Sequence, residues 1–322
     1  MIGCFQNWSL NNYFRVKKGI NLLDVCLLGC GGSMPVPNRS LTSMLISYNG
    51  SKLLIDCGEG TQVSMKILGS GFKAIDMICF THYHADHIAG LPGLLLTIAN
   101  SGRIEPLIIV GPLGLRKVVE GMTVIAPMLP YELKLIEVQQ DFYELKLNDM
   151  IIHTIACEHT LPCLGYSIEI KRRKKFNRDK AKINNIPMKL WSILQKGQSV
   201  EFNGKTFVPE MVLGDERKGI KICYVTDSRP IDPFVDFIKE AELFICEGMY
   251  SEDDSLEKAI KNKHMLFSEA AVLAKEGSVK ELWLTHFSPS LKEPEEHLEP
   301  TKKVFENTIV GKDRLCKSIN FT

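Results

Sequence analysis

Three imidazoles and one carboxylate stand within six residues of this chain, in the segment Thr81–His87. The segment follows the apolar run Met77–Phe80, which has the character of a buried strand. A helix would place His82 and Asp86 on one face and turn His84 elsewhere, whereas a tight loop leaving the strand lets all four side chains converge. Imidazole nitrogen with carboxylate oxygen suits zinc, with one position left open for water. The alternative is a surface histidine cluster that binds no metal.

Four further residues with ligand chemistry each come just after an apolar β run: Asp56, His159, Asp227 and His286. Loops at strand ends on one edge of a sheet are where α/β folds assemble sites from distant parts of the sequence. Any one of these residues alone is more often structural, but their common placement predicts a shared site. The thiols of Cys157 and Cys163 flank His159 and are alternative ligands, although burial as small apolar residues is the favoured interpretation.

The elements that position these residues are mostly short β runs, joined later by alternating strands and helices. Asn49-Gly50 predicts a type I′ hairpin between two of the strands. Strand runs followed by helices in both halves of the chain predict an α+β fold, with two sheets packed face to face and helices outside. The expected strands are 24–29, 43–48, 52–56, 77–80, 107–110, 133–138, 142–147, 151–156, 164–170, 220–226, 243–246 and 281–285. The expected helices are 61–68, 88–100, 113–120, 233–241 and 267–276.

A polar, basic segment from Lys171 to about Gly219 interrupts this succession of strands and helices. Its first part, 171–189, contains nine lysines and arginines against a single acid, Asp179. Asn203-Gly204 predicts a small hairpin near its end. The segment is interpreted either as an inserted arm that binds a polyanion or as a solvated basic loop.

Composition sets limits on the class of protein. The chain has 322 residues, of which 45% are hydrophobic, and a formal net charge of +1, so any polyanion site must be a local basic patch. Ten scattered cysteines without a CxxC pair predict reduced thiols in a cytoplasmic protein. No window reaches the ~20 apolar residues of a membrane span. Residues 1–20 lack a secretory h-region and are expected to form an extension that packs on the domain or on a partner subunit.

The motifs resemble those of the metallo-β-lactamase superfamily and, more narrowly, of the ribonuclease Z family. The resemblance covers residues 24–290 and rests on THxHxDH at Thr81–His87, on the motif Ile55–Gln62, on His159 before Leu164-Gly165-Tyr166, and on Leu284–Ser288. It implies an αβ/βα four-layer sandwich over residues 21–322, with a substrate arm inserted at about 171–219.

The resemblance also implies the site residues. Two zinc ions per subunit, replaceable by Mn²⁺ or Fe²⁺, would be held by His82, His84 and His159 and by Asp86, His87 and His286, with Asp227 bridging. Asp56 would orient the ligand histidines. Asp86 would orient the attacking hydroxide or accept its proton, and His264, held protonated by Glu247, would be the general acid for the leaving oxygen. His153 and His297 match no motif and are expected to be structural.

The activity implied by the resemblance is removal of the 3′ trailer from precursor tRNA by a homodimeric, cytoplasmic enzyme without membrane contact. The substrate-binding residues would be Arg39, Lys171, Arg172, Arg173, Lys174 and Lys175. Alternatives are the same chemistry on another RNA or on a cyclic or small phosphodiester, a glyoxalase II-type thioester hydrolase, and a nucleic-acid-binding protein with a decayed site.

Three departures from the family pattern concern substrate recognition. The arm reads Ile186-Pro187-Met188, without the usual Gly-Pro after Ile-Pro. The loop Pro35–Ser40 keeps Arg39 of the PxKxRN pattern and loses the Lys and the Asn. Ser228 replaces the usual Thr after Asp227, and Ser290 stands where Arg often closes the His286 motif. The expected metal ligands are unaffected.

Overall fold

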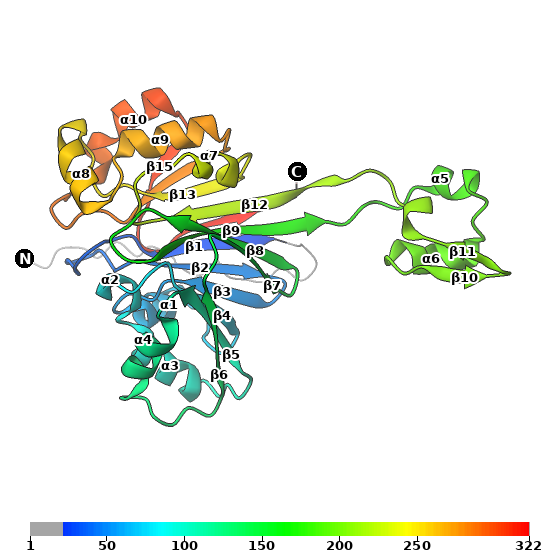
Figure 1. The fold of residues 1–322 in the computed structure, drawn as a ribbon, viewed down its shortest axis with the longest axis horizontal. Coiled ribbons are helices and arrows are strands. Elements are labelled where there is room, and N and C mark those ends of the chain that lie inside the picture. The colour runs from blue at the N-terminus through cyan, green and yellow to red at the C-terminus, as the bar shows by residue number, and fades with distance from the viewer. Residues whose placement is uncertain (1–21, 322) are drawn as a thin grey trace, which may run out of the picture. The chain divides into compact units, whose positions relative to one another are not determined.

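A computed structural model describes residues 22–321 and is shown in Figure 1. These residues divide into a larger unit, 22–169 with 221–320, and a smaller unit, 170–220 with Phe321. The expected extension at residues 1–20 lies outside the described residues. No helix in residues 22–321 is long and apolar enough to cross a membrane.

The larger unit contains two seven-stranded sheets, each mixed in direction. In the first, β3 to β6 are parallel and the remaining pairs are antiparallel. Its order is β16 (Leu315–Ile319), β1 (Leu23–Gly29), β2 (Ser43–Tyr48), β3 (Ser51–Ile55), β4 (Ile75–Cys79), β5 (Leu107–Pro112) and β6 (Leu133–Val138).

The second sheet has parallel strands from β12 to β15 and an antiparallel β7–β8 pair. Its order is β15 (Thr308–Val310), β14 (Leu282–Thr285), β13 (Leu243–Glu247), β12 (Arg217–Val225), β9 (Cys163–Arg172), β8 (Met150–Cys157) and β7 (Phe142–Leu147).

Helices cover the outer face of each sheet, so that the larger unit has four layers (Figure 1). Leu94 and Ile98 belong to one apolar cluster with Ile78 and Ile109 of the first sheet. The helices on this side are α1 (Thr61–Leu68), α2 (Ala85–Ile88), α3 (Leu91–Asn100) and α4 (Leu115–Thr123). Those on the other side are α7 (Pro233–Ile238), α8 (Leu256–Asn262), α9 (Phe267–Glu276) and α10 (Leu298–Val304), with short 3₁₀ turns η3 (Asp253–Ser255) and η4 (Pro294–His297). The predicted α+β sandwich is confirmed.

The smaller unit has its own apolar cluster, formed by Ala181, Ile186, Leu190, Leu194 and Val212. Its hairpin turns at Asn203 and Gly204, both with positive φ, where the Asn-Gly signal predicted it. The elements are α5 (Arg178–Ile183), η1 (Met188–Leu190), α6 (Trp191–Gln195), β10 (Val200–Phe202), β11 (Lys205–Phe207) and η2 (Pro209–Met211). The segment is therefore a folded module.

The helix expected over 88–100 is interrupted at Gly90. A Cβ at Gly90 would lie 2.2 Å from the carbonyl oxygen of Gly58, so two loops meet there at a distance that only glycine allows. Pro92 then stands in the first turn of α3, where its missing N–H costs no helical hydrogen bond. The break separates the turn that carries Asp86 and His87 from the longer helix.

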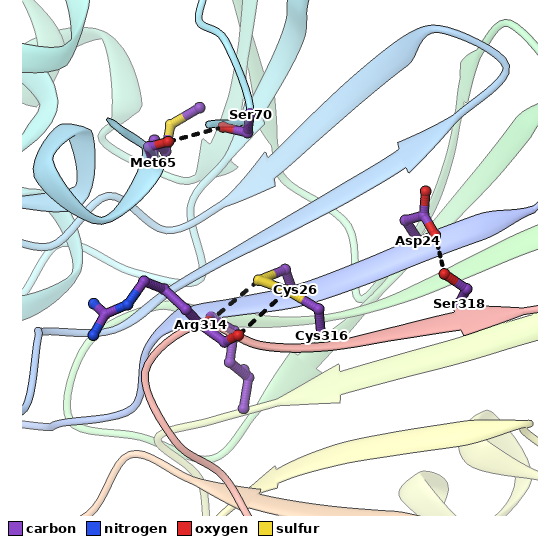
Figure 2. Close-up of a disulfide and its surroundings, with 8 residues drawn as sticks. Asp24, Cys26, Met65, Ser70, Arg314, Cys316 and Ser318 are labelled. Atoms are coloured by element: carbon purple, nitrogen blue, oxygen red, sulfur yellow. Dashed lines mark hydrogen bonds between the residues drawn. A yellow bond between two sulfur atoms is a disulfide. The ribbon is translucent and has the colours of Figure 1, made fainter. Parts of the chain in front are cut away.

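The expectation that the cysteines are all reduced thiols is wrong for one pair. Cys26 of β1 and Cys316 of β16 are directly opposite in the antiparallel register and form a disulfide. Figure 2 shows this bridge between the two strands, with the hydrogen bond from Ser318 to Asp24 farther along them. The pairing is not visible in the sequence because 290 positions separate the two residues.

Candidate metal centre

The side chains with ligand chemistry come from strand ends of both sheets of the larger unit. Asp56 follows β3, and Thr81–His87 follows β4. His159 lies after β8, Asp227 after β12 and His286 after β14. Asp56, Asp227 and His286 have φ values of 60°, 56° and 57°. The chain therefore turns through the left-handed region immediately after three of the strands, a conformation common at functional sites.

One group of donor atoms belongs to His82, His84, His159 and Asp227, all within 4.8 Å of one another. His82 Nε2 lies 2.9 Å from His84 Nδ1, which lies 3.3 Å from His159 Nε2. Asp227 Oδ1 is 3.9 Å from His82 Nε2 and 3.8 Å from His159 Nε2. The donors thus face a common point.

A second group belongs to Asp86, His87 and His286. His286 Nε2 lies 3.1 Å from His87 Nε2 and 3.2 Å from Asp86 Oδ2. The other oxygen of Asp227, Oδ2, is 3.1 Å from His87 Nε2 and 3.3 Å from His286 Nε2. Asp227 therefore presents one oxygen to each group.

Hydrogen bonds on the far side of three rings fix which nitrogen faces the centre. His82 Nδ1 lies 3.1 Å from Thr81 Oγ1, and His159 Nδ1 lies 3.2 Å from the Lys263 carbonyl oxygen. His87 Nδ1 lies 2.9 Å from Asp56 Oδ2, while Asp56 Oδ1 accepts from the Thr81 N–H at 2.8 Å. With protons on these Nδ1 atoms, each Nε2 presents a lone pair to the centre.

This arrangement fits a divalent metal. Nitrogen lone pairs that face one another near 3 Å repel unless a proton or a metal cation lies between them. Asp227 Oδ2 is buried and makes no hydrogen bond of ordinary geometry, although His87 Nε2 is only 3.1 Å away. Burial lowers the pKa of His82, His84 and His159 below the usual 6.5, which keeps these rings in the neutral form that binds metal. Imidazole and carboxylate donors suit zinc and similar ions.

A histidine–glutamate pair lies beside the metal-ligand groups. Glu247, fully buried at the end of β13, places Oε2 2.9 Å from His264 Nδ1, and its Oε1 accepts from the Ser228 N–H at 2.6 Å. Burial opposes charge on His264, but the Glu247 and Asp227 carboxylates raise its pKa from 6.5 to about 9. The His264 ring stacks on that of His286, with centroids 5.7 Å apart. The two carboxylates therefore favour the protonated form of the His264 ring.

The remaining predicted residues lie in different surroundings. The Arg39 guanidinium donates to three backbone carbonyls, those of Ser288, Leu291 and Lys292. Lys171, Arg173, Lys174 and Lys175 are exposed and Arg172 is half-buried, all in the smaller unit.

Histidines and cysteines without a predicted metal role lie outside the two groups. His153 contacts Glu144, and His297 contacts Glu252. Cys163 Sγ lies near the Thr226 carbonyl at 3.7 Å, and burial raises its pKa well above the usual value. Among residues 22–321, neither ligand group contains a cysteine.

Several residues shape the site without having been singled out from the sequence. The Ser33 N–H donates to Asp86 Oδ2 at 2.6 Å, and Gly32 lies against the His286 ring. The Thr81 hydroxyl lies within 3.2 Å of both His82 and His87. The sequence motifs do not indicate these contacts.

Comparison with known proteins assigns the family. A family model described as Anti-Pycsar protein Apyc1 matches residues 23–116. Ribonuclease Z of Clostridium acetobutylicum is 58% identical over 306 residues, which cover 93% of this chain and 99% of the relative. The metallo-β-lactamase fold protein YhfI from Bacillus subtilis has a TM-score of 0.68 at 21% identity, covering 93% of this chain and 100% of the other. The short form of human tRNase Z has a TM-score of 0.64 at 24% identity, covering 93% and 99%. On sequence identity of this extent over nearly its whole length, the chain belongs to the ribonuclease Z family.

Proposed function

We propose that the protein is a metal-dependent endoribonuclease that removes the 3′ trailer of precursor tRNA. The observation that carries the proposal is the His264–Glu247 pair beside the ligand groups. A thioester hydrolase expels a good leaving group and does not need an acid there, whereas a ribose 3′-oxygen leaves with difficulty unless it is protonated. Family membership supports the same substrate class.

The metal ions are proposed to be two Zn²⁺ per subunit, with Mn²⁺ or Fe²⁺ as possible replacements. His82, His84 and His159 would hold one ion, and Asp86, His87 and His286 the other. Asp227 would bind both, in keeping with one oxygen facing each group. When bound, such ions supply Lewis acidity and make water a nucleophile at neutral pH.

The chain's own residues complete the reaction. Asp86, whose Oδ2 is fixed by the Ser33 N–H, orients the attacking water or accepts its proton. Water attacks the phosphorus, the bond to the 3′-oxygen of the tRNA breaks, and His264 gives its proton to that oxygen. Glu247 holds the His264 ring in place and favours its charged form.

Recognition of the RNA is proposed to lie in the basic smaller unit. Lys171, Arg172, Arg173, Lys174 and Lys175 begin it, and contacts between such cations and phosphates dominate affinity for nucleic acid. Arg39 is proposed to serve substrate binding through the shape of its loop, because its guanidinium N–H groups bond the carbonyls of 288–292. The protein is also proposed to be a homodimer and to act in the cytoplasm.

Four substrates assayed side by side test this function: a precursor tRNA, a tRNA-like hairpin, bis-p-nitrophenyl phosphate and a glutathione thioester. Cleavage of the precursor at the 3′ end of the tRNA, lost on chelation and restored by Zn²⁺, is the expected result. Cleavage of the small diester without the precursor would instead favour a phosphodiesterase for another RNA or a cyclic substrate. Hydrolysis of a glutathione thioester alone would favour the glyoxalase II type.

A further inference from the structure

The guanidinium of Arg229 lies next to the backbone that carries the proposed general acid. Arg229 Nη1 donates to the His264 carbonyl oxygen at 2.5 Å and to Glu269 Oε2 at 2.8 Å. Nη2 contacts the other oxygen of Glu269, so the pair is bidentate. The Arg229 side chain is only 13% exposed. These contacts direct the guanidinium toward other groups of the protein.

Glu269 fixes the orientation of that guanidinium. Its Oε2 also accepts from the Leu266 N–H at 2.9 Å, which caps the first turn of α9. A planar guanidinium held by both carboxylate oxygens has little freedom to rotate. The start of α9 and the carbonyl of His264 are therefore tied to one rigid group.

The backbone of Arg229 connects the same group to the metal ligands. Its N–H donates to the Glu158 carbonyl at 3.1 Å, beside the ligand His159. Ser228 lies between Asp227 and Arg229, and its hydroxyl accepts from the Glu158 N–H at 3.0 Å. Lys263, whose carbonyl bonds the His159 ring, also pairs through Nζ with Glu158 Oε1 at 3.0 Å.

We propose that Arg229 is a positioning residue for the general acid: it anchors the main chain of His264 while Glu247 anchors the ring. Residues 263–266 lie between α8 and α9, outside either helix, where the His264 N–H donates to the Ala259 carbonyl at 2.9 Å and Arg229 holds the carbonyl side of His264. Without Arg229, the ring remains attached to Glu247, but its backbone can shift relative to the metal ligands. The inference rests on the proposed role of His264 as the proton donor.

The decisive measurement compares two substrates with different leaving groups. A positioned acid affects the rate only when the departing oxygen is a poor leaving group. Arg229→Ala in the metal-loaded full chain is expected to lower kcat on precursor tRNA by ~10²-fold, the scale of a misplacement of about 1 Å. On bis-p-nitrophenyl phosphate kcat is expected to change little, since nitrophenolate leaves without a proton. KM and bound zinc should be unchanged.

A double variant separates positioning of His264 from an independent role. Combined with His264→Ala, Arg229→Ala should cause almost no further loss on precursor tRNA, because both changes remove the same proton transfer. Added guanidinium ion should partly restore the Arg229→Ala enzyme and should not restore His264→Ala. Arg103→Ala is a matched control: its buried guanidinium also donates to three carbonyls, but these belong to residues outside the site, so any loss should be equal on both substrates.

Three results would overturn the inference: equal losses on both substrates, loss of zinc, or losses that multiply in the double variant. If Arg229→Ala does not fold, Arg229→Lys replaces it: it keeps the charge but has a single donor nitrogen in place of the bidentate fork, so the same selective loss on precursor tRNA is expected. If the wild-type protein does not process precursor tRNA, the proposed substrate fails on its own. The leaving-group comparison can then be made with aryl phosphodiesters of graded leaving-group pKa. For both Arg229→Ala and His264→Ala, log kcat should fall more steeply with rising leaving-group pKa than it does for the wild type, and the two slopes should be the same.

Discussion

The ring of His286 lies directly against Gly32. A Cβ built on Gly32 would be 2.7 Å from both Cε1 and Nε2 of His286, closer than such atoms approach in proteins. The ring of His286 also stacks on that of His264, with the centroids 5.7 Å apart. A methyl group at position 32 therefore fits only if His286 or the loop of Gly32 moves.

Gly32→Ala is expected to displace His286 and weaken binding of the ion that His286 would hold. Changes to groups that orient ligands typically cost ~10–100-fold in metal affinity. Competition with a chromophoric chelator measures the affinity of each ion separately. Gly121→Ala is the matched control, because a Cβ on this exposed helical glycine meets no atom within 4 Å. Its zinc affinity should equal that of the wild type, and an equal loss in both variants would contradict the role of Gly32.

Removal of metal is expected to lower stability as well as activity. The donor atoms of His82, His84, His159 and Asp227 lie within 4.8 Å of one another, so a bound cation should stabilise this arrangement of the native state. A ligand present at 100 times its Kd stabilises the native state by about 2.7 kcal/mol. Thermal denaturation should therefore shift to lower temperature after dialysis against a chelator and return with Zn²⁺. An unchanged Tm on complete removal would contradict a metal centre built from these residues.

His264→Ala is expected to slow cleavage of precursor tRNA by ~10²–10⁴-fold, the usual range for loss of a general acid. The reduction on bis-p-nitrophenyl phosphate should be much smaller because its leaving group needs no proton. Single-turnover kinetics on both substrates measure the difference. A similar reduction on the two substrates would assign His264 to binding or structure.

The pKa of His264 gives a prediction for the metal-free protein. Its value of about 9 lies above the usual 6.5, so the protonated ring stabilises the folded state. The contribution is complete below pH 6.5 and is lost as the pH rises through about 9. NMR titration should show His264 titrating near the upper value, and Glu247→Gln should lower it. If Glu247→Gln leaves the titration unchanged, the pair is not the cause of the shift.

Neutralising the smaller unit should separate RNA binding from chemistry. Arg173, Lys175, Arg178 and Lys182 are exposed, and changing all four to Gln should flatten the plot of log affinity for tRNA against log salt. The slope should fall by roughly 0.7–0.9 for each phosphate that the variant no longer neutralises. Turnover of bis-p-nitrophenyl phosphate should stay near that of the wild type.

The control for that experiment changes four exposed lysines of the larger unit, Lys66, Lys117, Lys134 and Lys303, to Gln. It alters the net charge equally, so it should leave the salt dependence close to that of the wild type. If the slope falls equally in both variants, the effect comes from overall charge and the smaller unit is a solvated basic module.

The ligand groups could be anticipated from the sequence because each member follows an apolar run that ends in a turn. Strand ends on facing sheets brought Asp56, Asp227 and His286 together as their placement indicated. Contacts between loops far apart in the chain could not be anticipated in the same way. The Arg229–Glu269 pair spans 40 positions, and the packing of Gly32 on His286 depends on how two loops cross. The helix break at Gly90 was also missed, because apolar periodicity continues through it.

Strand β16 pairs with β1, so the first sheet is completed by residues 315–319. During synthesis, β1 emerges almost 300 residues before its partner, and until then one side of it is an unpaired strand edge. A chain released before residue 315 keeps that edge open and is exposed to edge-to-edge aggregation. Ribosome stalling or proteolytic trimming that removes residues 315–319 would therefore destabilise the sheet that carries Asp56 and the Thr81–His87 loop. The missing residues themselves would contribute no metal ligand.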